Sequence, residues 1–142
     1  MRTVFAFPAG GRAETIALLE RHSPDRRDPW LIYDSLYIEI VEARSGSLYL
    51  DWDAESLAAL DAAIGERPDW ALQIDVSGRI DGTDEVHRIL TLVLEHGGVA
   101  FDDYTDHAWT LPEIQTGVTV DGLSFFDFRG YRGSRSGTEA DN

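Results

Sequence analysis

The chain of 142 residues is long enough for a single domain with its own hydrophobic core. It has 26 acidic residues against 12 arginines, no lysine and no cysteine, and a formal net charge of −14. The missing cysteines exclude disulfides and thiolate chemistry, and the negative charge argues against nucleic acid as a direct partner because phosphates are repelled. The same charge favours a basic protein partner, although acidity that only maintains solubility explains it equally well.

Neither membrane insertion nor export is indicated by the sequence. No apolar run approaches the roughly 20 residues that a membrane-spanning helix needs. The N-terminal stretch MRTVFAFPAGGRAE has one basic residue ahead of an apolar run that is too short for the hydrophobic region of a signal peptide. We therefore expect a cytoplasmic protein with no membrane partner.

The first 76 residues predict the element order strand, helix, strand, strand, helix, strand. Apolar runs and two-residue alternation mark the strands, and apolar residues three or four apart mark the helices. The predicted ranges are 3–7, 13–20, 36–40, 48–52, 54–64 and 70–76. This order is typical of a ferredoxin-like βαββαβ core, in which a mostly antiparallel sheet carries its helices on one face. The predicted fold class is α+β.

The predicted strands also carry acids on their second face. Strands 36–40 and 48–52 form a hairpin around Ser45-Gly46-Ser47, and the alternation turns their polar residues away from the core. The acidic residues turned outward in this way are Glu39, Asp51 and Asp75. An ordinary solvated sheet face explains them as well as a binding surface does.

The second half predicts a third helix, a short strand and a C-terminal hairpin. The helix is marked by an apolar stripe of Val86, Ile89, Leu90, Val93 and Leu94. A strand over 99–101 follows, and Asp121-Gly122 suits the tight turn of a hairpin between 118–120 and 123–126. We expect a single α+β domain over residues 1–131 and a disordered polar tail over 132–142.

The densest group of candidate binding residues lies in the segment 97–114, GGVAFDDYTDHAWTLPEI. Thr110 and Glu113 are explained as the capping box of a short helix, in which each side chain accepts from the other residue's backbone N–H. This leaves a loop over 102–109 that combines acids, a histidine and aromatic rings. Its candidate residues are Asp102, Asp103, Tyr104, Asp106, His107 and Trp109.

Two chemical interpretations of this loop predict an active site. Asp102, Asp103, Asp106 and His107 are hard ligands suited to a divalent cation, but neither EF-hand nor HExxH spacing occurs. His107 beside an aspartate also suits acid–base catalysis, although no recognisable nucleophile motif accompanies it.

Two other interpretations need no chemistry. The aspartates can cap turns while the rings of Tyr104 and Trp109 fill the core, in which case the loop is purely structural. Alternatively, aromatic rings rimmed by carboxylates bind a basic protein, because rings supply buried area and acids speed the encounter and pair with arginine or lysine. The outward acids Glu39, Asp51 and Asp75 would extend such a surface.

A family resemblance favours the protein-binding interpretation. The segment FDDYTDHAWTLPEI, with the amphipathic helix and Gly97-Gly98 before it, resembles small acidic actinobacterial proteins, several of which look like immunity proteins paired with polymorphic toxins. The likeness covers residues 70–128. It implies a cognate inhibitor that binds a toxin domain and blocks its active site, and it assigns no role to any single residue.

The sequence thus predicts a protein-binding domain that is not an enzyme and uses no cofactor or metal. Its predicted partner-binding residues are the six loop residues together with Glu39, Asp51 and Asp75. The alternatives are a metal-dependent or small-molecule enzyme that uses the DDYTDH loop, and a structural domain with no site there. The sequence leaves open the identity of the partner, the strand order and the oligomeric state.

Overall fold

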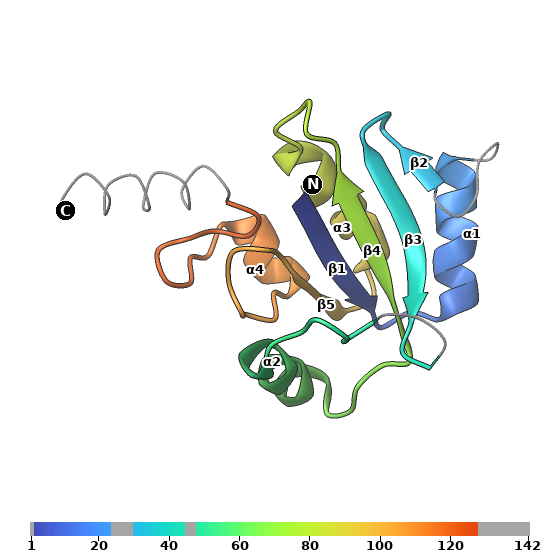
Figure 1. Ribbon diagram of the computed structural model, residues 1–142. Coiled ribbons are helices and arrows are strands. Elements are labelled where there is room, and N and C mark those ends of the chain that lie inside the picture. The colour runs from blue at the N-terminus through green and yellow to red at the C-terminus, as the bar shows by residue number, and fades with distance from the viewer. Residues whose placement is uncertain (1, 24–29, 45–47, 128–142) are drawn as a thin grey trace.

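The computed structural model describes residues 2–23, 30–44 and 48–127, and over these residues the fold is α+β (Figure 1). A five-stranded antiparallel sheet has the strand order β2-β3-β4-β1-β5 and is accompanied by four helices. The strands are β1 (Arg2–Pro8), β2 (Trp30–Ile32), β3 (Leu36–Glu42), β4 (Trp70–Val76) and β5 (Gly98–Phe101). The helices are α1 (Arg12–His22), α2 (Ala54–Ile64), α3 (Thr83–Val93) and α4 (Leu111–Thr116). The predicted turn at 45–47 and tail at 132–142 lie outside the described residues.

The chain has the predicted order strand, helix, strand, strand, helix, strand, but the two middle strands are β2 and β3 rather than the predicted 36–40 and 48–52. The strand pairing also differs from that of a ferredoxin-like core. In such a core the first and third strands are neighbours, whereas here β4 lies between β3 and β1 and pairs with both. A split βαβ unit does occur, at β4-α3-β5. Both of its strands are antiparallel to β1, so they run parallel to each other with β1 between them. The N-terminal strand therefore occupies an interior position in the sheet.

The predicted hairpin between 36–40 and 48–52 is wrong, because β3 pairs with β2 instead. The connection from β2 to β3 turns sharply at Tyr33 and Asp34, which both have left-handed backbone conformations with φ of 54° and 57°. Residues 48–52 form turns rather than a strand. Their apolar alternation is misleading, since Leu48 is buried against the sheet while Leu50 is 77% exposed.

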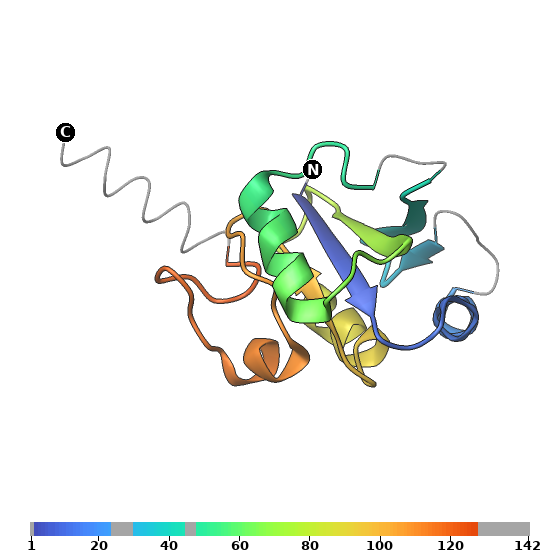
Figure 2. The same ribbon diagram turned by 90° about the horizontal axis from the view of Figure 1, so that it is seen from below.

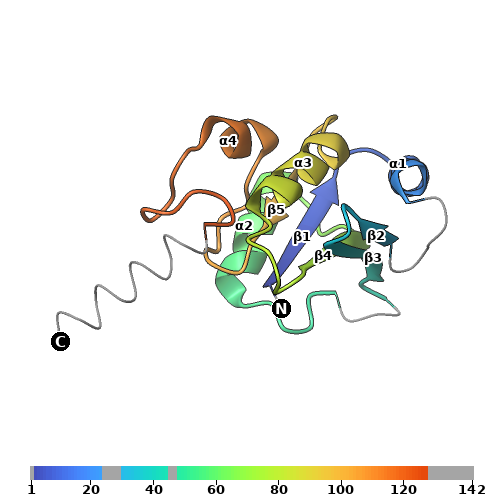
Figure 3. The same cartoon turned by 90° about the horizontal axis from the view of Figure 1, so that it is seen from above.

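The sheet lies between α3 on one face and α2 on the other (Figures 2 and 3). Each face carries a hydrophobic core. On the helix face, even-numbered residues of β1, β3 and β4 pack against α3, and Leu19 of α1 and Ile114 of α4 join the same core. The predicted apolar stripe of α3 is confirmed, because all five of its residues are buried. The opposite face is called the open face. There Leu48, which precedes α2, and Leu60 of α2 cover Phe7 and its neighbours in β5. The expectation of helices on one face is thus correct for α1, α3 and α4 and wrong for α2.

Helix and hairpin ends largely follow the sequence. Asp53 caps α2 by accepting from Ser56 N–H at 2.7 Å, and the Thr110–Glu113 capping box of α4 is present. The predicted C-terminal hairpin is reduced to one bridge, Val120 to Leu123, around a left-handed Asp121-Gly122 turn. No helix in the described part of the chain is long and apolar enough to cross a membrane.

Gly98 at the start of β5 provides a test of the β1–β5 pairing. Its φ is +111°, and a Cβ atom there would lie 2.1 Å from the carbonyl oxygen of Phe7. Gly65 also has a positive φ, of +96°, but a Cβ atom there would meet nothing within 4 Å. We expect Gly65→Ala to lower the free energy of unfolding by about 1–2 kcal/mol from backbone strain alone. We expect Gly98→Ala to cost at least about 2 kcal/mol more, measured by denaturant unfolding, and equal losses would contradict the close approach of β1 and β5.

Candidate protein-binding surface

Asp102 is a structural hub rather than an exposed binding residue. Its side chain is buried at the end of β5, and its Oδ1 accepts hydrogen bonds from the backbone N–H groups of Tyr104 and Thr105, both at 3.1 Å. Its Oδ2 accepts from Phe126 N–H at 2.7 Å, which ties the loop to the C-terminal segment. Burial raises the pKa of the Asp102 carboxyl, although these three N–H groups and the Thr105 hydroxyl oppose the rise.

The aromatic residues of the loop also have structural roles. Trp109 is fully buried, exchanges two backbone hydrogen bonds with Ala100 of β5, and donates its indole N–H to Thr105 Oγ1 at 3.1 Å. Tyr104 is half-buried, with its ring 5.9 Å from that of Phe126. The loop therefore covers the outer edge of β5, and its two large rings are used mainly in packing.

His107 pairs with the capping glutamate. Its Nε2 lies 3.1 Å from both carboxylate oxygens of Glu113, and its ring packs edge-on against Trp109 at 4.8 Å between centroids. Burial alone would raise the pKa of Glu113, but the hydrogen bonds from Thr110 N–H and His107 lower it below its ordinary value. The histidine thus orders the start of α4.

The predicted metal or catalytic set does not converge. Among the described residues, the set of three possible metal ligands whose atoms lie within 4.8 Å of one another consists of Asp53, Glu55 and Asp106. Asp106 also accepts from the Ser56 hydroxyl at 2.8 Å. Asp102 and His107 are engaged elsewhere, so the metal-site alternative loses two of its four ligands.

The remaining loop acid, Asp103, belongs to the open face of the sheet. Its Oδ2 accepts from Thr3 N–H of β1 at 2.8 Å, which places the carboxylate beside the edge of the β1–β4 pair. Although Asp103 is exposed as a residue, its carboxylate is partly desolvated, and this desolvation together with the charges of Asp102 and Asp75 raises its pKa. The loop therefore contributes one acid to the sheet surface.

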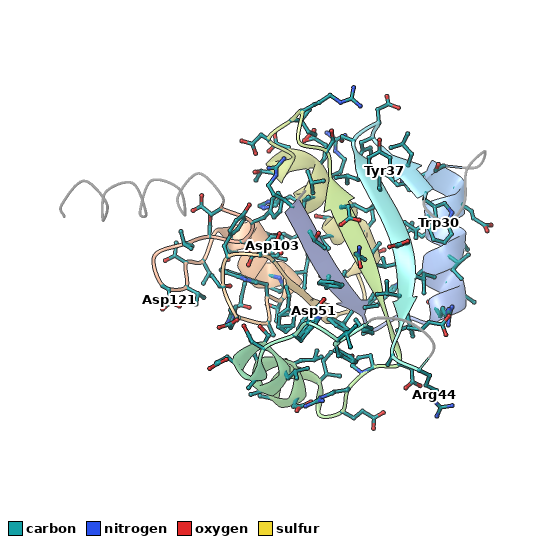
Figure 4. The ribbon with its side chains drawn as sticks, in the orientation of Figure 1. Trp30, Tyr37, Arg44, Asp51, Asp103 and Asp121 are labelled. Atoms are coloured by element: carbon teal, nitrogen blue, oxygen red, sulfur yellow. The ribbon has the colours of Figure 1, made fainter. Side chains whose placement is uncertain are left out.

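A cavity of about 350 Å³ lies on this open face (Figure 4). It combines two carboxylates, two aromatic rings and polar groups of β1 and β4. The lining residues are Thr3, Phe5, Leu48, Asp51, Trp52, Gln73 and Asp103. Asp51 is brought there by the turn segment 48–52, which crosses the lower end of the sheet in the view of Figure 4.

Strand register places the other predicted acids next to this cavity. Asp75 stands opposite Thr3 in the β1–β4 ladder and opposite Tyr37 in the β3–β4 ladder. Glu39 stands opposite Gln73, one pair further along the same face. The predicted outer-face acids Glu39, Asp51 and Asp75 are thus gathered with Asp103 on one surface, although Asp51 reaches it from a turn rather than from a strand.

The sequence interpretation missed Thr3, Phe5, Trp52 and Gln73 as members of the surface. Two-residue alternation was a usable signal, since it places Thr3 and Phe5 on the face opposite Val4, and Gln73 on the same side of β4 as Asp75. What that alternation does not reveal is that β1 and β4 are neighbours. Trp52 becomes a member only because its ring packs 5.4 Å from that of Phe5.

Comparisons with known proteins give no match, whether to family models, to curated proteins or to solved structures. The arrangement of acids and rings on the open face therefore carries the functional inference.

The structural role of Asp102 can be measured directly. Asp102→Ala would leave the buried N–H group of Phe126 and the partly buried N–H groups of Tyr104 and Thr105 without their acceptor. We expect the free energy of unfolding to fall by about 1–3 kcal/mol, as for other orphaned buried donors. Glu95→Ala, at an exposed position, should stay within about 0.5 kcal/mol of wild type in the same denaturant titration. A neutral effect of Asp102→Ala would contradict the hub.

The raised pKa of Asp103 predicts a pH-dependent effect of Asp103→Asn. Because the pKa of Asp103 in the folded state lies above the ordinary 3.8, folding favours the protonated carboxyl. The protonated carboxyl makes its full contribution to stability below pH 3.8, and this contribution is lost as the pH rises through the folded-state pKa. The amide keeps an oxygen for Thr3 N–H. We expect the variant to match wild type in unfolding free energy near pH 3 and to exceed it at pH 7. A stability difference that shrinks with rising pH would refute the shift.

Proposed function

We propose that the chain is a protein-binding domain that holds a basic partner against the open face of its sheet. The observation that carries this proposal is the cavity in which Asp51 and Asp103 stand beside the exposed parts of Phe5 and Trp52. Aromatic rings supply contact area that is desolvated on binding, and a rim of acids selects a positively charged partner. Neither feature requires a reacting group.

The charge distribution supports a partner rather than internal ion pairing. Ion pairs in the described part of the chain join Arg12 to Glu42, Arg67 to Asp61, and His107 to Glu113. None of these three ion pairs involves Asp51, Asp75 or Asp103. A net charge of −14 adds long-range attraction for a basic protein and speeds association.

The resemblance of residues 70–128 to small acidic immunity proteins gives this function a specific form. In that form the chain is a cytoplasmic immunity protein that neutralises a basic toxin by covering its active site. Occlusion needs only a complementary surface and sufficient affinity, which suits an acidic face with aromatic anchors. The first partner to test is a toxin domain encoded by the neighbouring gene.

Charge-removal variants test the proposed face. Asp51→Asn, Asp75→Asn and Asp103→Asn combined remove three charges from the open face, whereas Glu14→Gln, Glu95→Gln and Asp121→Asn remove three from exposed positions outside the cavity. We expect the first triple variant to weaken binding to the basic toxin domain by about tenfold or more, because several charge pairs are lost together. The second triple variant should change affinity by less than about threefold.

Calorimetry at several salt concentrations and an assay of the toxin's activity provide the measurements. Wild-type affinity should fall as salt rises, because salt screens attraction between exposed charges. Equal losses in the two triple variants would assign the effect to net charge and remove the open face as the binding surface. A toxin that binds but stays active would contradict occlusion.

A further inference from the structure

The floor of the open-face cavity has its hydrogen-bond donors already in use. Thr3 Oγ1 donates to Asp75 Oδ1 at 2.8 Å, and Thr3 N–H donates to Asp103 Oδ2 at 2.8 Å. Gln73 Nε2 donates to Asp75 Oδ2 at 3.2 Å. The amide oxygen of Gln73 therefore points away from Asp75 and can accept a hydrogen bond from a ligand. What the floor still offers is acceptor oxygens. A ligand that satisfies them has to bring several donors.

The walls of the cavity favour a flat organic cation. The rings of Phe5 and Trp52 meet at 59° with their centroids 5.4 Å apart, and Trp52 also packs edge-on against Phe101 with 4.9 Å between centroids. The faces of such rings attract cations, and a planar guanidinium also stacks on them, which a hydrated ammonium does less well. A bare divalent cation gains little from aromatic walls, because it prefers a shell of oxygen ligands.

The position of the two acids suits a group with donors in a fork. Asp51 enters from the 48–52 turn and Asp103 from the loop after β5, so the carboxylates reach the cavity from separate segments (Figure 4). A guanidinium has five N–H donors fixed in one plane and can serve two carboxylates at once. The volume of about 350 Å³ is at the lower end of the range for ligand pockets, about 300–1,000 Å³, and fits one long side chain rather than a helix.

We propose that this cavity is an arginine pocket: one arginine side chain of the partner lies between Asp51 and Asp103 with its guanidinium against Trp52. The inference rests on the proposed function, since that function supplies the partner from which the arginine comes. It adds that the contact is a single inserted side chain, and that lysine cannot replace it without loss, because lysine lacks the planar fork.

The pocket can be tested on the isolated chain with small probes. N-acetyl-arginine amide, N-acetyl-lysine amide and the neutral analogue N-acetyl-citrulline amide are titrated while two-dimensional NMR follows the Trp52 indole and the Gln73 side-chain amide. We expect saturable shifts of both signals with the arginine probe, at least about fivefold weaker binding of the lysine probe, and no saturable shift with citrulline. Equal binding of the arginine and lysine probes would overturn the proposal. Shifts produced instead by Mg²⁺ or Ca²⁺ would reassign the pocket to a metal.

Single variants locate the binding. Asp51→Asn and Asp103→Asn should each weaken the arginine probe by about threefold to fivefold, the range expected for one exposed charge pair. Asp121→Asn is the matched control, because it makes the same chemical change at an exposed turn position with φ of +54°, a conformation that asparagine tolerates. A control variant that weakens the probe as much as Asp103→Asn would contradict a localised pocket.

The outcomes separate this inference from the proposed function. If the basic toxin domain binds through the open face but the arginine probe leaves Trp52 and Gln73 unshifted, the arginine pocket is wrong and the binding face stands. If the arginine probe binds and no basic protein does, the pocket stands and the proposed function is wrong. Replacement of individual arginines in a bound toxin domain by lysine then identifies the inserted side chain, since only that replacement should lower affinity about fivefold or more.

Discussion

The structure depends on the interior position of β1. It pairs with β4 on one side and β5 on the other, so its alternating side chains contribute to both cores at once. Val4 and Ala6 lie in the core under α3, while Phe7 lies in the core under α2. The β1–β5 contact is close enough that only a glycine fits at position 98. Without β1 in this place, neither the two cores nor the open face would form.

The same strand connects folding to the proposed recognition surface. Thr3 of β1 stands opposite Asp75 and donates its backbone N–H to Asp103, so β1 orders Asp103 of the cavity and Asp75 next to it. The Asp103 carboxylate is partly desolvated and is repelled by Asp75, and both effects disfavour its charged form. A basic partner would relieve that repulsion. This is a physical reason why the open face, which is mildly unfavourable in the free protein, suits the proposed binding of a basic partner.

The loop over 102–109 shows why dense polar residues need not form a site. Its backbone turns away from β5 and buries N–H groups, which need acceptors once they leave water. Asp102 supplies those acceptors, and His107 is used by Glu113 at the start of α4. Trp109 is buried and pairs with Ala100, so that it covers the edge of β5. Asp103 is the loop acid that lines the open-face cavity, and it does so because Thr3 is beside it.

Local chemistry in the sequence determined the helices, their caps and the alternation of the strands. The Asp53 cap, the Thr110–Glu113 capping box and the buried stripe of α3 follow from residues a few positions apart, whose relations any folded form would keep. Tertiary structure alone decided that β4 separates β3 from β1, that 48–52 is a turn, and that Asp51, Asp75 and Asp103 share one face. The pairings of β1 join residues about 70 to 100 positions apart. Two-residue alternation fixes which face a side chain takes but not which strand lies beside it.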